Sequence, residues 1–227
     1  MREKNQDYET LSSIFNAWWN NLQSRDKATG EPIKINGIAK PPNRQALAQL
    51  RRVNGIDNGG ASAVDVVMAL GIDEFRALLK RLNDGKLTNS QVRRWLNPDT
   101  LELEPFVIAA ASLARIREDA SHESDRRGAT AAMLGAGFPD DQPFAEARFK
   151  RLMRCRNDWP DLMIQARRVS AILERKAPVG DFGASIVLWN AEPRIIRDWA
   201  FQYYQKDFEP AGEPPEAAAA PPAAIST

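Results

Sequence analysis

Apolar residues recur at helical spacing along most of this chain, and this periodicity restricts the possible folds more than any other feature. In the first such segment, residues 8–22, the large side chains repeat at helical intervals: Leu11, Ile14, Phe15, Trp18, Trp19 and Leu22. This spacing places them on one face of an α-helix. No segment shows a convincing two-residue alternation of the kind that marks a half-buried strand. The sequence therefore predicts an all-α fold.

Capping residues and glycines delimit further helices in the amino-terminal part. Asn43 can cap a helix of sequence RQALAQLRRV, whose last turn carries Arg51 and Arg52. Two short helices, VDVVMAL and IDEFRALLKRL, are predicted to meet near Gly71. The segment PFVIAAASLARIRED is so rich in alanine and other apolar residues that we expect it to form a central core helix.

The carboxyl-terminal part shows the same kind of signal. Asp158 and Pro160 mark the start of a helix that we expect to run to about Lys176. A glycine-rich turn, PVGDFG, is predicted to separate it from the apolar segment ASIVLW. Glu192 and Pro193 then open the final helix, RIIRDWAFQYYQKD.

The polar stretch ASHESDRRGAT is a candidate boundary between two parts of the fold. We expect two small helical bundles packed together, an amino-terminal one over residues 1–125 and a basic carboxyl-terminal one over residues 126–208. Residues 209–227 consist largely of proline, alanine and glutamate, which cannot bury enough apolar surface to order themselves. We therefore expect a disordered tail.

The chain shows no targeting or disulfide signal. No apolar stretch reaches the roughly 20 residues that a membrane-spanning helix needs, and the amino terminus, MREKNQDYET, has no signal-peptide core. We therefore expect a cytoplasmic protein with no membrane partner. The single cysteine, Cys155, excludes an internal disulfide, and we interpret it as a small packing residue.

Positive charge is concentrated in one short segment, although the formal net charge of the whole chain is only +1. The run RFKRLMRCR, residues 148–156, carries five basic residues in nine. As a helix it would place Phe149, Leu152 and Met153 on one arc, with Ala145 beside them. The opposite arc would carry four basic side chains: Arg148, Lys150, Arg151 and Arg154. Such a face suits a phosphate backbone.

The two following helices carry basic residues away from their apolar stripes in the same way, Arg168 and Arg175 in the first and Arg194 and Arg197 in the second. The tryptophans sit mostly at stripe positions, which favours core packing over base stacking. Recognition of a nucleic acid would then rest on phosphates, tolerate any base sequence and weaken steeply as salt rises.

Enzyme signatures are nearly absent. The sole histidine, His122, lies in a polar loop that offers no fixed partner for a catalytic triad. The carboxylate pairs Asp140 with Asp141, and Asp57 with Asp65, fit loops and helix caps better than a magnesium site. The chain has neither a phosphate-binding glycine loop nor a zinc ligand set. We expect no catalytic activity, no cofactor and no metal.

The order of the motifs resembles a known family. The stretch ARFKRLMRCRNDWPDLMIQARRVSAIL, followed by VLWNAEPRIIRDWAFQYY, resembles the small subunit of type I-E CRISPR Cascade effector complexes, the CasB family. The amino-terminal FNAWWNNL and the helix ALAQLRRV fit the same pattern. Together these matches extend from Tyr8 to Tyr204.

The resemblance implies an all-helical, non-catalytic protein that works in antiviral defence. It also implies a set of partners: guide RNA and target DNA, the backbone and large subunits of Cascade, and a second copy of the chain. The phosphate-contacting residues carried over by position are Arg52, Arg148, Arg168 and Arg194. Helical geometry adds Arg51, Lys150, Arg151 and Arg154. Arg126 and Arg127 match only a basic loop of variable form.

The chain departs from compact members of that family by the tail and by extra sequence between Asn83 and Leu101. Three other functions stay open on the sequence alone. One is a free-standing helical nucleic-acid-binding protein with a helix-turn-helix at Gly71, although Asp73 and Glu74 would oppose phosphate approach. The others are a metal-dependent nuclease and a structural helical adaptor.

Overall fold

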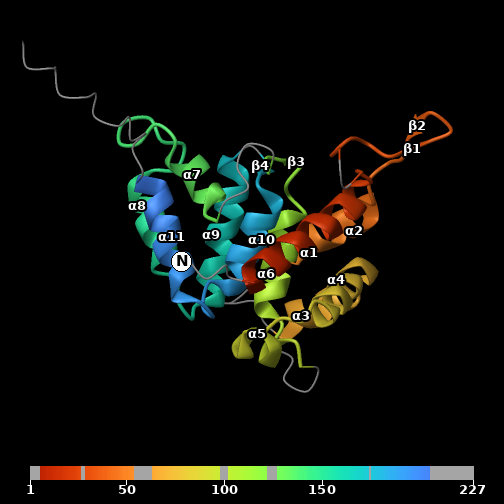
Figure 1. Ribbon diagram of the computed structural model, residues 1–227, viewed down its shortest axis with the longest axis horizontal. Helices are drawn as coiled ribbons and strands as arrows, with labels where there is room; N and C mark the ends of the chain where they lie inside the picture. The colour runs from red at the N-terminus through yellow and green to blue at the C-terminus, as the bar shows by residue number, and fades with distance from the viewer. Residues whose placement is uncertain are drawn as a thin grey trace, which may run out of the picture.

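The computed structural model describes residues 6–26, 29–53, 63–97, 102–121, 127–173 and 175–204. This part of the chain forms eleven helices and four two-residue strands, which confirms the predicted all-α class (Figure 1). The expected disordered tail, residues 209–227, lies outside the described residues, as do His122, Arg126 and Asp57.

The helices are α1 (Gln6–Gln23), α2 (Arg44–Arg52), α3 (Ala63–Leu70), α4 (Asp73–Asp84), α5 (Ser90–Trp95), α6 (Glu104–Leu113), α7 (Ala129–Gly135), α8 (Glu146–Met153), α9 (Trp159–Ile172), α10 (Val179–Leu188) and α11 (Pro193–Tyr204). Strands β1 (Lys34–Ile35) and β2 (Ile38–Ala39) pair antiparallel. Strands β3 (Glu118–Asp119) and β4 (Lys176–Ala177) pair parallel.

Local signals position several of these helices as predicted. The Asn43 side chain accepts a hydrogen bond from the Ala46 backbone N–H at 3.1 Å, and α2 begins directly after it. Asp158 accepts one from the Asp161 backbone N–H at 3.0 Å and caps α9. Each side chain satisfies one of the backbone donors that the first turn of a helix leaves without a partner.

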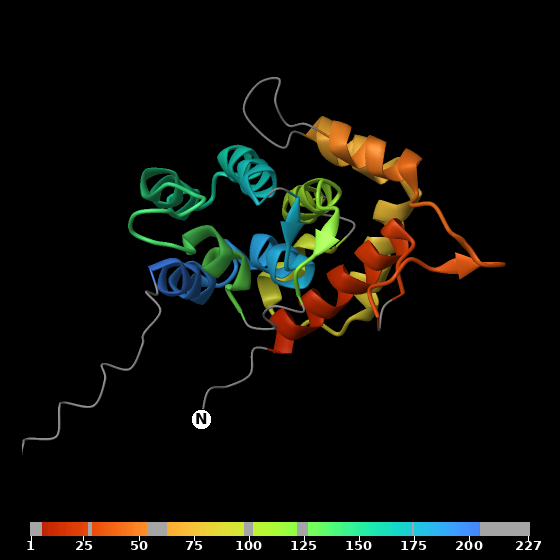
Figure 2. The ribbon, with the colours of Figure 1, turned by 90° about the horizontal axis from the view of Figure 1, so that it is seen from above.

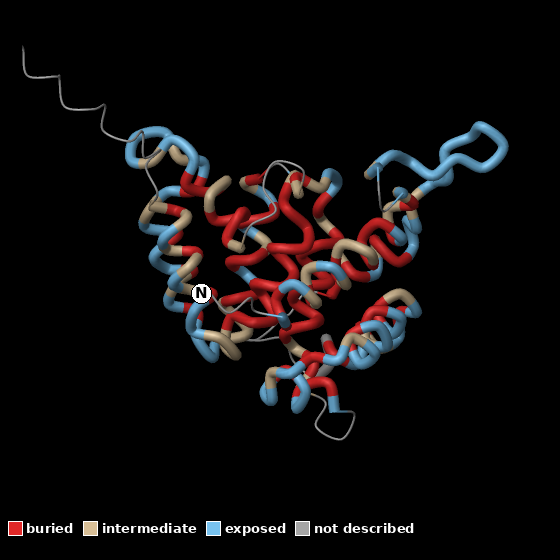
Figure 3. The backbone as a smooth tube through the Cα atoms, viewed as in Figure 1, coloured by how far each residue is buried: buried red, intermediate tan, exposed pale blue. Residues whose placement is uncertain are grey.

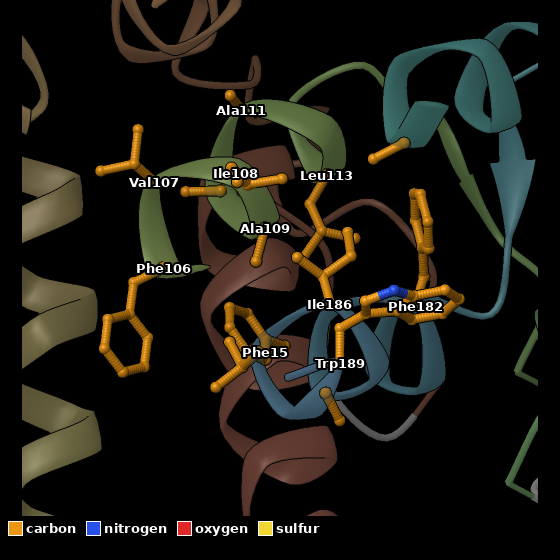
Figure 4. Packing of buried hydrophobic residues seen from close by; sticks show 14 of the residues in the cluster. Phe15, Phe106, Val107, Ile108, Ala109, Ala111, Leu113, Phe182, Ile186 and Trp189 are labelled. Carbon is orange, nitrogen blue, oxygen red and sulfur yellow. The ribbon is translucent and has the colours of Figure 1, made fainter. Parts of the chain in front are cut away.

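The centre of the molecule is built from α6 and α10 with α1 packed across them (Figures 1 and 4). Every residue of α6 from Pro105 to Leu113 is buried, and so is every residue of α10, which confirms the expected central core helix. Figure 4 shows side chains of the three helices meeting in this core, among them Phe15, Ile108 and Phe182. Trp18, Trp19 and Trp199 are buried, as their stripe positions predicted, and Trp189 is buried as well.

The glycine-rich segment PVGDFG is not a turn, contrary to the prediction, but forms the beginning of α10. Its glycines serve a close helix–helix approach. A Cβ atom on Gly180 would lie 2.2 Å from Ser12 Oγ, and one on Gly183 would lie 2.6 Å from the ring of Phe15. Both contacts are with α1, so the missing side chains let α1 lie directly on the backbone of α10. This packing outweighs the low helix propensity of glycine.

Asp181, between these glycines, links three segments that are far apart in the sequence. Its buried carboxylate accepts a hydrogen bond from the hydroxyl of Tyr8 on α1. It also accepts one from each of two backbone N–H groups at the start of α7, those of Gly128 and Thr130, both at 2.8 Å. A buried carboxylate is tolerated only when donors replace its water. Asp181 therefore fixes α1 and α7 relative to α10.

Two helices end earlier than predicted because the following residues pair as strands. The predicted core helix ends at Leu113, and α9 ends at Ile172 instead of near Lys176. Beyond these ends β3 and β4 form a two-residue parallel ladder, and Arg175 adopts a left-handed backbone conformation (φ 68°) just before β4. A ladder of two residues leaves no periodic signal in the sequence.

The extra sequence between Asn83 and Leu101 contributes to the core. Its described part contains α5, from which Val92 and Trp95 are buried. The ring of Trp95 meets that of Trp159 edge to face, with 5.6 Å between the ring centroids. The described part of this segment therefore belongs to the hydrophobic core.

The hairpin of β1 and β2 projects from the body of the molecule and is exposed along its whole length (Figures 1 and 3). Ile35 and Ile38 face each other in its register and are 57% and 75% exposed. The division into bundles of residues 1–125 and 126–208 stays a prediction. Buried residues from both ranges belong to one hydrophobic cluster.

Replacing Asp181 with Ala should destabilise the protein strongly, because the backbone N–H groups of Gly128 and Thr130 would lose a buried acceptor. We expect the free energy of unfolding to fall by about 3 kcal/mol, from a cost of about 1–3 kcal/mol for each orphaned donor. Urea denaturation followed by circular dichroism measures this change.

The matched control is Asp73→Ala, whose side chain is 83% exposed at the start of α4. Its cost should stay below about 1 kcal/mol. Equal costs for the two variants would show that the Asp181 network does not hold the helices together.

Candidate nucleic-acid interface

Helix α8 carries the basic run and is anchored by an aromatic stack. Phe149 and Leu152 are buried, and the ring of Phe149 stacks on that of Tyr203 in α11 at a centroid distance of 3.7 Å. Ala145, which the helical projection placed beside this stripe, is exposed because the helix begins only at Glu146. The four basic side chains predicted for the opposite arc are all exposed: Arg148, Lys150, Arg151 and Arg154.

Carboxylates neutralise half of this basic face. Lys150 pairs with Glu146 at 2.8 Å, and their hydrogen bond raises the pKa of Lys150 and lowers that of Glu146. Arg151 pairs with Asp161 in the first turn of α9 at 3.2 Å. Among the described residues no carboxylate pairs with Arg148 or Arg154. Of the four residues on the predicted basic face, these two arginines can therefore meet a phosphate without first breaking an ion pair.

The other candidate residues lie on three helices. Arg52 is the exposed last residue of α2, Arg194 is exposed near the start of α11, and exposed Arg168 on α9 donates to Gln165 Oε1 at 3.3 Å. Arg51 is half-buried, and its Nε donates to the backbone oxygen of Ala114 at 2.7 Å.

Three of the helices that carry these residues follow one another along one side of the molecule, in the order α8, α9 and α2 (Figure 2). The end of α2 contacts α9 directly, because Arg167 Nη2 donates to the Val53 backbone oxygen at 2.6 Å. The structure thus brings the end of α2, with Arg51 and Arg52, against the helix that carries Arg168. Helix α11, with Arg194, lies across the molecule from α9, on the far side of α7 in the same view.

Arginines gather where α2, α6 and α9 end, and two of them, Arg115 and Arg167, were not predicted from the sequence. Arg51, Arg115, Arg167 and Arg175, with Ser170 and Ala171, line a cavity of about 140 Å³, which we call the arginine pocket. Arg115 follows the buried helix α6, and Arg167 precedes the predicted Arg168. The only sequence signal was their excess of positive charge, since nothing local shows that these segments converge.

Cys155 is a packing residue, as predicted. It is buried beneath α8, and its thiol contacts the Arg151 backbone oxygen at 3.4 Å and Asp161 Oδ2 at 3.2 Å. Burial and the hydrogen bond to Asp161 raise its pKa to about 12.

Two further features bear on the sequence-based expectations. Among the described residues, no group of three or more histidine, cysteine, aspartate or glutamate side chains is placed to hold a metal ion. No helix in that part of the chain combines the length and the apolar character of a membrane-spanning segment.

One comparison with known proteins gives a match. The family model described as CRISPR-associated protein Cse2 matches residues 46–204, which is more than half of the chain and includes all eight candidate residues. No curated protein and no solved structure matches the chain.

The thiol of Cys155 should resist alkylation in the folded protein. At pH 8 a pKa of about 12 leaves only about one thiol in ten thousand as thiolate, the reactive form. We expect iodoacetamide to react at least about 10³-fold more slowly with folded than with urea-unfolded chain, followed by mass spectrometry. Because the pKa is raised, the rate for the folded chain should keep rising between pH 8 and pH 10. Comparable rates in the two states would contradict this assignment.

Proposed function

The chain belongs to the family of CRISPR-associated protein Cse2, and on this premise we propose that it holds the target and displaced DNA strands of an R-loop through contacts to their phosphates. Family membership makes it a subunit of a CRISPR Cascade complex, as the sequence resemblance predicted. In our proposal it is the non-catalytic small subunit. Its partners would be guide RNA, target DNA, the backbone and large subunits, and a second copy of itself.

The observation that carries the proposal is the family match, and the exposed arginines support it. Arg52, Arg148 and Arg194 are exposed, and none has a carboxylate partner among the described residues. A guanidinium group presents a planar fork of donors that fits two phosphate oxygens. These side chains are therefore available to a polyanion.

The burial of the aromatic residues supports contacts to the backbone of a strand over contacts to its bases. Of the aromatic side chains that the structure describes, only Phe201 on α11 is exposed, at 62%. Single-strand binders that hold bases use several exposed aromatic platforms. We infer binding that tolerates any base sequence, which suits a subunit whose complex reads sequence through guide RNA.

Modest contacts are sufficient for this role. When guide RNA pairs with target DNA, one duplex replaces another of similar stability, so the exchange is nearly balanced. Protein contacts to the opened strands add free energy only to the open state. A few arginines can therefore shift the equilibrium toward the R-loop without performing chemistry.

Replacing Arg148 and Arg168 together with Ala should weaken target binding by the reconstituted Cascade complex. Each phosphate contact to a single strand contributes about 0.7 to the slope of log K against log salt concentration. We expect affinity to fall most at low salt and the slope to become shallower by about 1.4. Electrophoretic mobility shifts at several salt concentrations give both values.

The matched control is Lys80→Ala with Arg93→Ala, which removes the same charge from exposed positions on α4 and α5. This variant should keep the wild-type slope. If both double variants behave alike, net charge and not specific phosphate contact explains the effect. An unchanged slope for Arg148→Ala with Arg168→Ala would remove these two residues from the proposed interface.

A further inference from the structure

The arginine pocket has the composition of an anion site. Arg51 comes from α2, Arg115 from the end of α6, Arg167 from α9 and Arg175 from the turn before β4. Among the described residues that line it, none carries a negative charge. The pocket reaches the surface, because Ala171 and Arg175 are exposed.

Three of the arginines have a structural role, and in Arg51 and Arg115 it leaves part of the hydrogen-bonding capacity available. Arg51 donates to the Ala114 backbone oxygen at 2.7 Å, and Arg115 donates back to the Arg51 backbone oxygen at 3.1 Å. Arg167 donates to the Val53 oxygen at 2.6 Å. These bonds cover carbonyl groups at the ends of α2 and α6, which would otherwise repel an anion. A guanidinium group has five N–H donors, so the bonds of Arg51 and Arg115 to carbonyls use a minority of their donors.

Within the described part of the chain, no carboxylate pairs with Arg51, Arg115 or Arg175, so the positive charges of these three pocket residues are not balanced by ion pairs. Three helices end here, and the negative end of each dipole is equivalent to about half a charge, so together they offset about 1.5 of these three positive charges. Burial lowers the pKa of Arg51, and the positive charges of Arg117, Arg175 and Arg115 lower it further. Burial also lowers the pKa of Arg115, and the positive charge of Arg175 lowers it further. Both groups stay protonated, so the repulsion persists until an anion relieves it.

One donor inside the cluster also lacks an acceptor. The Nε of Arg115 is buried and has no hydrogen-bond partner among the described residues. Buried N–H groups almost always have one. An anion in the pocket could supply this acceptor.

The size of the cavity limits the ligand. Its volume of 140 Å³ corresponds to between four and five water molecules at about 30 Å³ each. A phosphate group has five heavy atoms and fits this space, whereas a base with its sugar does not. The exposed Arg52 and Arg168 follow pocket residues Arg51 and Arg167 in the chain.

We propose that the arginine pocket seats a single phosphate group of a nucleic-acid strand, between the ends of α2, α6 and α9. The proposal deepens the proposed function and rests on it, because that function supplies the strand. It adds Arg115 and Arg167, which the helical pattern alone did not select, to the phosphate contacts.

Arg175 offers a test that spares the structural bonds. Its side chain donates no hydrogen bond within the described residues, and its left-handed backbone conformation (φ 68°) also suits asparagine. Inorganic phosphate is titrated into the full chain by isothermal calorimetry at constant ionic strength, with a four-residue oligothymidine lacking terminal phosphates as competitor. We expect one phosphate per chain, displaced by the oligothymidine, and Kd values for both ligands about tenfold higher in Arg175→Asn.

Two controls complete the experiment. Arg175→Lys keeps the charge and should retain most of the affinity, and Arg197→Asn removes an exposed charge on α11 and should change neither Kd. The Tm of each variant in sodium chloride verifies the fold. Wild-type affinity in Arg175→Asn would overturn the proposal and leave the arginines as helix caps. If the oligothymidine does not displace the bound phosphate, the proposal that the ligand is a nucleic-acid strand is wrong. The ligand is then a free or terminal phosphate.

The outcome is separable from that of the proposed function. If the pocket fails these tests while Arg148→Ala with Arg168→Ala still weakens target binding, only the pocket assignment falls. If the double variant has no effect while phosphate still binds at Arg175, the assignment of Arg148 and Arg168 is wrong and that of the pocket is supported.

Discussion

The buried carboxylate of Asp181 is the interaction on which the arrangement of the helices depends. It joins α1, the start of α7 and α10, whose residues are widely separated in the chain. The flanking Gly180 and Gly183 make this possible, because they let α1 approach close enough for Tyr8 to reach the carboxylate. A directional contact of this kind selects one arrangement among the many that apolar stripes alone would permit.

The basic surface follows from that core. Helix α6 packs against α10 and also contacts α9 and α2. The packing of the core therefore determines where the ends of α2, α6 and α9 converge. Arginines at those ends donate hydrogen bonds to backbone carbonyl groups and line the same cavity. The same side chains thus join the helices and create a local excess of positive charge, which a near-neutral total charge conceals.

The sequence predicts what is encoded locally and fails where distant segments meet. The apolar stripe of α1 and the caps Asn43 and Asp158 each act within a few residues, and all three were recognised. The helix at GDFG was mistaken for a turn, since only contact with α1 explains its glycines. The convergence of Arg115 and Arg175 depends likewise on tertiary packing and a two-residue ladder, neither of which has a periodic signature.

The projecting hairpin shows how a short strand limits self-association. Ile35 and Ile38 place apolar side chains beside open backbone edges, the combination that templates cross-chain pairing in amyloid-prone segments. With two residues per strand, the ladder offers an incoming chain too few backbone groups to offset the entropy of ordering it. A longer hairpin with the same side chains would lose this protection.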